Sequence, residues 1–168
     1  MLYYSIVRII GIDPGYATVG YGVVDYDKAR FSALDYGAIV TSADSPFERR
    51  LAEVYADLCG LIDIYKPQFM AVERVFFTTN QKTAIDVSQA RGVILLAAVQ
   101  NTVEIAEYTP LQVKQSVTGY GKAAKSQVQE MTKRILNLPA IPKPDDTADA
   151  LAIAVCHAHT YSSVRTVK

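Results

Sequence analysis

The spacing of hydrophobic residues along the chain predicts which segments form strands. Apolar residues run almost without a break through 6–13, which is typical of a buried strand. Apolar and polar positions alternate in 19–26, and a third strand is expected over 31–41. Two shorter apolar segments, 69–73 and 103–108, predict a fourth and a fifth strand.

Helical spacing dominates the rest of the chain. Ser45 and Pro46 open a helix that should run to about Lys66, where Pro67 ends it. Further helices are expected over 83–100, 110–117, 123–136 and 146–159. Three adjacent strands followed by alternating helices and strands indicate an α/β fold with a mixed five-stranded sheet flanked by helices.

Length and composition favour one globular domain. The chain has 168 residues, half of them hydrophobic, which suffices for one core, and we expect a single domain over 1–168 with its core at about 7–159 and a short C-terminal tail. Lys and Arg balance Asp and Glu at 17 each. A nucleic-acid partner would therefore need a local basic patch, and the surplus of basic residues lies after residue 67.

The cysteines and the N-terminus bear on cellular location. Cys59 and Cys156 both lie in helical apolar patterns, as expected for reduced core thiols. The apolar N-terminus lacks the basic region and cleavage site of a signal peptide, and no apolar run reaches the roughly 18 residues of a membrane span. We expect a cytoplasmic protein.

Four acidic residues interrupt the most apolar segments. Asp13 and Glu73 end two predicted strands, and Asp146 and Asp149 open the last helix. An ionised carboxylate among Ile, Val and Ala costs several kcal/mol unless a cation compensates it, as roughly estimated from transfer data. A bound divalent metal is the candidate, because no Lys or Arg precedes each of the four as an obvious local partner.

The expected fold would bring these acids together. If the strands of Asp13 and Glu73 are parallel neighbours, both side chains emerge at one carboxyl edge of the sheet. Asp146 and Asp149 are three residues apart, so they share one helix face. Four carboxylates at one point would favour two Mg²⁺ ions, with Mn²⁺ as an alternative, in the arrangement used to cut phosphodiesters.

Taken singly, each acid has a simpler explanation. An aspartate at a strand end is most often a turn former, and Asp146 alone would be a helix N-terminal charge. Asp145 has that same explanation, although it would replace Asp146 if the helix start were shifted by one residue. The combination of the three acidic segments in this order is far more specific than any one of them.

At this point the sequence resembles the RuvC-type crossover junction endodeoxyribonucleases, Holliday junction resolvases of the ribonuclease H-like superfamily. The matching segments are IIGIDPGYATVGYGVVD, MAVERVFFTTNQKTAIDVSQARGVILLAAV, YTPLQVKQSVTGYGKAAKSQVQEM and DDTADALAIAVCHA. The resemblance implies a ribonuclease H-like fold and a homodimer that nicks two strands of a four-way DNA junction symmetrically, together with a RuvA–RuvB branch-migration complex.

The resemblance also assigns residues. It places Asp13, Glu73, Asp146 and Asp149 at the family's metal-binding acids. Lys114, Lys125 and the neighbouring Lys122 fall at basic positions near the DNA, where the implied role is phosphate contact; without the resemblance they would be a solvated lysine face. Phe76 matches an aromatic residue that stacks on an unpaired base. The helix over 84–100 resembles the family's dimer helix.

Three other functions remain open at this point. The GIDPG segment also fits the phosphate loop of actin-like ATPases, although these need a second lobe for which the chain has little room. A ribonuclease H-like enzyme acting on RNA or on RNA–DNA hybrids is a second alternative. A catalytically silent junction-binding module is the third, and it would be expected to have lost one of the acids.

Overall fold

Five strands form one mixed sheet. The structure is a computed structural model that describes residues 6–74 and 81–166. The strands lie in the order β3-β2-β1-β4-β5. Their bounds are β1 Val7–Asp13, β2 Thr18–Asp27, β3 Arg30–Val40, β4 Phe69–Glu73 and β5 Glu104–Tyr108. All five lie within a few residues of the predicted segments, and the mixed, helix-flanked sheet is confirmed.

The register of the central strands decides where the acids lie. Strand β1 pairs in parallel with β4, with Ile12 opposite Val72. Asp13 and Glu73 each follow one of these two residues, so both leave the sheet at the same carboxyl edge. On its other side β1 pairs antiparallel with β2, where Gly20 lies opposite Asp13. The expectation that the two acidic strands are parallel neighbours is therefore confirmed.

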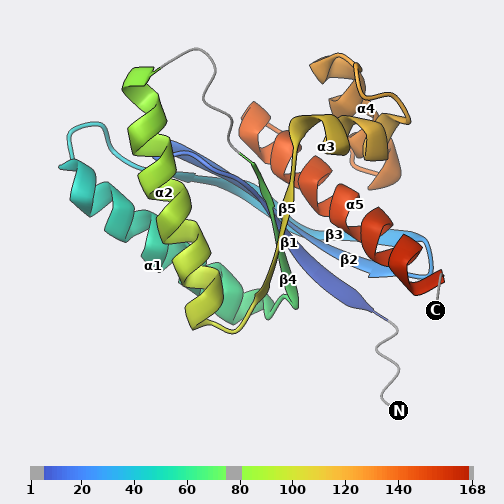
Figure 1. The fold of residues 1–168 in the computed structure, drawn as a ribbon, viewed down its shortest axis with the longest axis horizontal. Helices are drawn as coiled ribbons and strands as arrows, with labels where there is room; N and C mark the ends of the chain where they lie inside the picture. Colours follow the sequence, from blue (N-terminus) through green and yellow to red (C-terminus); the bar gives the residue numbers. More distant parts are fainter. Residues whose placement is uncertain (1–5, 75–80, 167–168) are drawn as a thin grey trace.

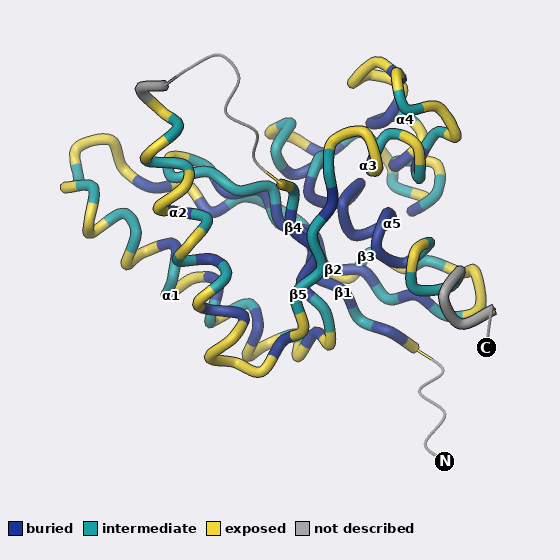
Figure 2. The backbone as a smooth tube through the Cα atoms, in the orientation of Figure 1, coloured by how far each residue is buried: buried dark blue, intermediate teal, exposed yellow. Residues whose placement is uncertain are grey.

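Helices cover both faces of the sheet (Figure 1). Helices α1 and α2 cover one face, and α3, α4 and α5 cover the other. Their bounds are α1 Phe47–Tyr65, α2 Gln81–Gln100, α3 Pro110–Thr118, α4 Lys125–Ile135 and α5 Asp145–Thr166. Each face has its own hydrophobic core, built on the alternate side chains of the same strands. Much of α5 is buried, as the dark blue segments of Figure 2 show.

Helix α5 extends further than the sequence predicted. It was expected to end near His159 and instead continues to Thr166. One contact explains part of the extra length: the Tyr161 ring packs on Phe69 with centroids 5.4 Å apart. Tertiary packing thus overrides the polar composition of this segment.

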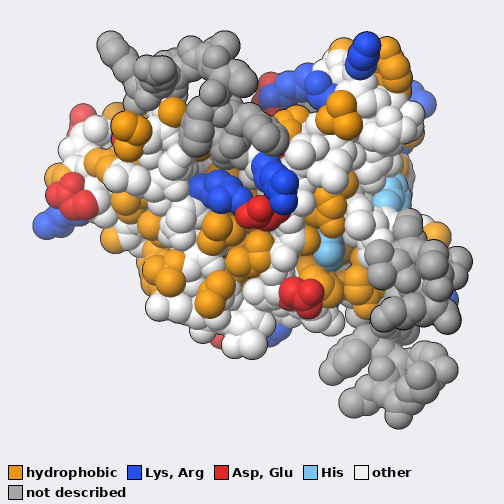
Figure 3. Space-filling view, viewed as in Figure 1, with side chains coloured by type: hydrophobic (Ala, Val, Ile, Leu, Met, Phe, Trp, Pro, Cys, Tyr) orange, Lys and Arg blue, Asp and Glu red, His pale blue; other side chains and the backbone are white. Residues whose placement is uncertain are grey.

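The outer surface of α2 is unusually apolar. Ile85, Leu96 and Val99 are 67%, 49% and 65% exposed. Figure 3 shows hydrophobic side chains gathered over α2 and beside β5.

Within the described residues, no helix is long and apolar enough to cross a membrane.

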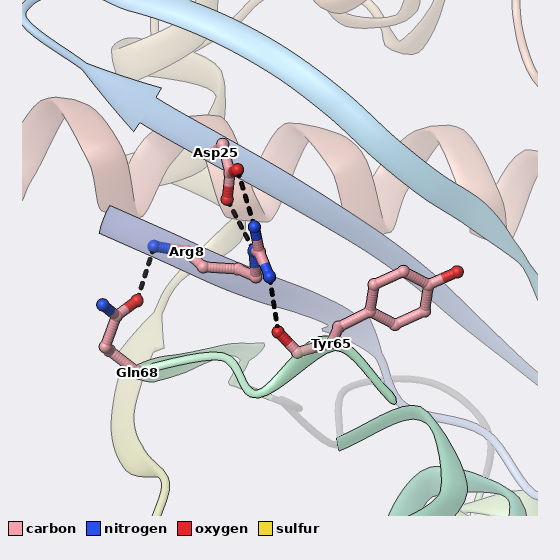
Figure 4. A network of polar contacts seen from close by, with 4 residues as sticks. All are labelled: Arg8, Asp25, Tyr65 and Gln68. Carbon is pink, nitrogen blue, oxygen red and sulfur yellow. Dashed lines mark hydrogen bonds and ion pairs between the residues drawn. The ribbon is translucent and has the colours of Figure 1, made fainter. Parts of the chain in front are cut away.

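A polar clamp fixes the end of β1 opposite to Asp13 (Figure 4). The Arg8 guanidinium donates two hydrogen bonds to the Asp25 carboxylate, at 2.7 and 2.9 Å, and a third to the Tyr65 carbonyl at 2.8 Å. The Arg8 backbone N–H donates to the Gln68 side-chain oxygen. Strands β1 and β2 are thereby tied to the segment between α1 and β4.

Candidate active site

Three elements carry the predicted acids to one edge of the sheet. Asp13 ends β1 and Glu73 ends β4, while Asp146 and Asp149 lie in the first two turns of α5. All four side chains are partly buried. The electrostatic influence of the other three acids reaches Asp13, so the structure brings the four together.

Glycines in the strands allow α5 to lie directly on the sheet. A Cβ atom on Gly20 would lie 2.0 Å from the Asp146 carbonyl oxygen, and one on Gly11 would lie 2.1 Å from the Ala150 carbonyl oxygen. No larger residue fits at either position without a shift of the helix backbone. Because Gly20 lies opposite Asp13 in the β1–β2 register, this close approach sets the position of Asp146 relative to Asp13.

Asp13 is the most perturbed of the four acids. Burial is the largest cause, and the charges of Glu73, Asp149 and Asp146 add to it, so that the pKa of Asp13 rises from 3.8 to about 8. Lys125 opposes this shift without cancelling it. An acid that holds its proton near neutral pH marks a point where the protein supplies too little positive charge.

Glu73 and Asp149 are partly compensated by lysines. Burial raises the pKa of Glu73, Asp149 raises it further, and Lys125 and Lys114 act against the rise. Burial also raises the pKa of Asp149, against the Lys125 ammonium, which lies 2.8 Å from its Oδ2 atom. The two lysines therefore lie inside the acidic site and not only around it.

A cavity of about 190 Å³ opens beside these groups. Glu73 and Asp149 line one part of it, and Lys114 and Lys125 line another. Helix α3 carries Lys114 and is fixed at its start by Thr109, whose hydroxyl accepts from the Gln112 N–H in a capping box. The cavity thus presents acids and cations side by side, which suits a polyanion held next to a metal.

The donor set fits a hard divalent cation. Among the described residues, no three Asp, Glu, His or Cys side chains are already arranged to hold an ion. The four acids nevertheless offer only carboxylate oxygens, the ligands that Mg²⁺ and Mn²⁺ prefer. The raised pKa values show a deficit of positive charge that such an ion would remove.

The alternative acid, Asp145, lies at the edge of this group, where it shares Lys125 with Asp149. Its carboxylate pairs with the Lys143 ammonium at 2.7 Å, and this contact lowers its pKa. Asp146, and not Asp145, is among the charges that act on Asp13. The geometry therefore favours Asp146 as the third acid of the group.

Two predicted DNA-binding residues, Lys122 and Phe76, are not part of the cavity lining described above. Lys122 is exposed in the turn between α3 and α4. Phe76 lies outside the described residues. His157, which the sequence placed too far along the last helix to bind the same metal, is buried and shares a 2.7 Å hydrogen bond with the Tyr108 hydroxyl.

Two features of the site were missed in the sequence. The ion pair between Lys125 and Asp149 joins two helices, and no local pattern reveals it. The close approach at Gly20 had a signal, because Gly20 and Gly22 lie in an otherwise apolar strand, where glycine often marks a close neighbouring backbone. The ion pair depends on how α4 packs against α5, and the close approach depends on how α5 packs on β2.

A family model and several curated relatives match most of the chain. Residues 9–157 match the family model described as crossover junction endodeoxyribonuclease RuvC. A relative of that name from Fusobacterium nucleatum is 54% identical over 157 residues, covering 94% of this chain and 83% of its own. The one from Ruminiclostridium cellulolyticum is 56% identical over 153 residues, with 91% and 92% covered.

Solved structures give the same result. The RuvC structure from Thermus thermophilus superposes with a TM-score of 0.86 at 36% identity, over 95% of this chain and 98% of that one. The complex of that protein with a Holliday junction substrate gives 0.85 at 34% identity, over 94% and 96%. The yeast mitochondrial resolvase Ydc2, at 13% identity and a TM-score of 0.68 over 95% and 82%, shares the fold.

Proposed function

The chain belongs to the crossover junction endodeoxyribonuclease RuvC family, and from that premise we propose that it resolves four-way DNA junctions by paired symmetric nicks during recombination and repair. The single observation that carries the chemistry is the uncompensated acidic group around Asp13, beside a cavity that also holds two lysines. We propose that residues 1–168 form one nuclease domain.

The four acids would hold the metal ions together. Asp13 and Asp149, from β1 and α5, would anchor them. Glu73 and Asp146 would complete the ligand set and orient the attacking water. Two Mg²⁺ ions, or Mn²⁺ in their place, would supply an activated water and a counter-charge for the leaving oxygen.

The lysines hold the DNA strand in place for this chemistry. Lys114 and Lys125 reach into the cavity beside Glu73, where they can bind the phosphates next to the scissile bond. Lys122 extends this contact from the turn outside the cavity. Phe76, three residues after Glu73 in the sequence, would stack on an unpaired base at the junction.

A two-fold dimer completes the proposed enzyme. Paired nicks need two active sites, and the exposed apolar side chains of α2 provide a surface for a second copy. We propose that the dimer works in the cytoplasm, with its cysteines reduced, next to a RuvA–RuvB complex that moves the junction. The free thiols of Cys59 and Cys156 are consistent with that compartment.

Cleavage of a synthetic four-way junction with a mobile core tests this proposal. The protein is incubated with and without Mg²⁺, beside a linear duplex and an RNA–DNA hybrid, and Asp13→Asn serves as the control. Paired symmetric nicks in the junction alone, dependent on metal and on Asp13, are expected. Cutting of the hybrid, or of no substrate with any divalent metal, would contradict it.

A further inference from the structure

Lys125 forms an ion pair with Asp149, one of the carboxylates that the proposed reaction requires. It begins α4, and its Nζ atom lies 2.8 Å from Oδ2 of Asp149 and 3.6 Å from Oδ2 of Asp145. The positive charge beside Asp149 is therefore supplied by the protein itself. An ion ligated by Asp149 would have to share that carboxylate with an ammonium group.

The contact is placed where it can open. The Lys125 side chain is 55% exposed and that of Asp149 is 31% exposed, so the ammonium approaches from the solvent side. Lysine carries its charge on a flexible four-carbon chain. Val128, one turn further along α4, is buried and anchors the helix. The ammonium can leave Asp149 without disturbing the packing of α4.

We propose that Lys125 is the resident counter-ion of the metal-free site and that it exchanges Asp149 for a DNA phosphate when a divalent cation binds. This inference rests on the proposed function, because it assigns Asp149 to the metal and Lys125 to the DNA. Two cations on one carboxylate repel each other, so the arriving ion displaces the ammonium. The displaced ammonium then needs an anion, which a bound DNA strand supplies within the same cavity.

The exchange couples two ligands. Metal binding to Asp149 releases the Lys125 ammonium, which can then bind a DNA phosphate. DNA binding in turn draws Lys125 away from Asp149 and leaves that carboxylate free for the metal. By linkage, each ligand must increase the affinity of the other by the same factor. Lys125 thereby makes the site bind metal and junction together.

A metal titration without DNA tests the first half of the exchange. Mn²⁺ affinity is measured by calorimetry for the wild type, Lys125→Met and the matched control Lys143→Met. Both lysines contact Asp145, but only Lys125 contacts Asp149. Lys125→Met should bind Mn²⁺ about tenfold more tightly and Lys143→Met by less than about twofold. An unchanged affinity in Lys125→Met, or an equal gain in both variants, would overturn the proposal.

Junction affinity with and without Ca²⁺ tests the second half, with the DNA verified to be uncut. The factor by which Ca²⁺ tightens binding should be about fivefold larger in the wild type than in Lys125→Met. Equal factors would overturn the exchange. If the wild type cuts no junction but Lys125→Met still binds Mn²⁺ more tightly, the proposed function is wrong. The role of Lys125 as counter-ion of the metal-free site then still stands. If the wild type cuts the junction while Lys125→Met binds Mn²⁺ with unchanged affinity, the exchange is wrong and the proposed function stands.

Discussion

The two ends of β1 treat a charged side chain in opposite ways. At one end, the Arg8 guanidinium has three hydrogen bonds to Asp25 and Tyr65. At the other end, burial and three neighbouring acids raise the pKa of Asp13 to about 8. The first end is neutralised within the protein and ties elements together. The second is left short of positive charge, which is the state that a divalent metal would complete.

Partial burial of a charge does not by itself indicate function in this protein. Arg8 and Asp25 lie directly opposite each other in the β1–β2 register, so their pairing satisfies both. At the Asp13 end the position opposite is Gly20, which offers a close backbone instead of a cation. A functional site is marked here by missing compensation.

The largest expected effect comes from removing the charge of the uncompensated end. Asp13→Asn and Glu73→Gln should each slow junction cleavage by at least about a thousandfold, because the metal loses a charged ligand. Junction affinity measured without divalent metal should stay within about threefold, since the lysines remain. Single-turnover cleavage and gel-shift binding measure the two quantities. Loss of both together would contradict the separation of binding and catalytic groups.

Removing the Arg8–Asp25 ion pair should lower the stability of the fold and leave metal binding at the other end of β1 unchanged. Asp25→Asn removes the partner of a half-buried guanidinium and should lower the free energy of unfolding by about 2 kcal/mol. Urea unfolding measures this change, and Mn²⁺ affinity should stay at its wild-type value. Asp63→Asn, which breaks the exposed pair with Lys66, is the control and should leave stability unchanged. A change in Mn²⁺ affinity in Asp25→Asn would show that the two ends are not independent.

A third, smaller effect appears as a pH dependence. Between pH 3.8 and about 8 the metal-free folded protein keeps the Asp13 proton that the unfolded chain releases, so stability should fall as the pH rises through this range. Asp13→Asn removes the loss and should stabilise the metal-free protein at pH 8 by about 1–2 kcal/mol. Urea unfolding at pH 5 and pH 8 tests this. An equal effect of the substitution at both values would be inconsistent with a raised pKa.

The smallest effect concerns the surface outside the cavity. Lys122→Ala should weaken junction binding by about threefold and reduce the salt dependence of the affinity by about one ion, because one phosphate contact is lost. Binding measured over a range of KCl concentrations tests this. A variant that binds like the wild type at every salt concentration would remove Lys122 from the interface.

Much of this arrangement could be predicted because it follows from local patterns. The strand ends that carry Asp13 and Glu73, and the spacing of Asp146 and Asp149, are visible in the sequence. The parallel pairing of β1 with β4 then brings them to one edge. The end of α5 was placed too early because its last turns depend on contacts such as that of Tyr161 with Phe69.

The long-range ion pairs could not be predicted for a physical reason. Arg8 and Asp25 belong to different strands, and Lys125 and Asp149 to different helices. Their pairing depends on the register of β1 with β2 and on the packing of α4 against α5. The sequence showed no local basic partner for the acids, and it could not show that Lys125, from another helix, pairs with Asp149.

Thermal unfolding at pH 8, with and without Mg²⁺, tests whether the acids around Asp13 form a metal site. If the acidic end of β1 lacks only a metal, Mg²⁺ should raise the Tm of the wild type and remove the loss of stability between pH 5 and pH 8. The Tm of Asp13→Asn should respond little. A wild-type Tm that Mg²⁺ leaves unchanged, or an equal rise in Asp13→Asn, would contradict the account.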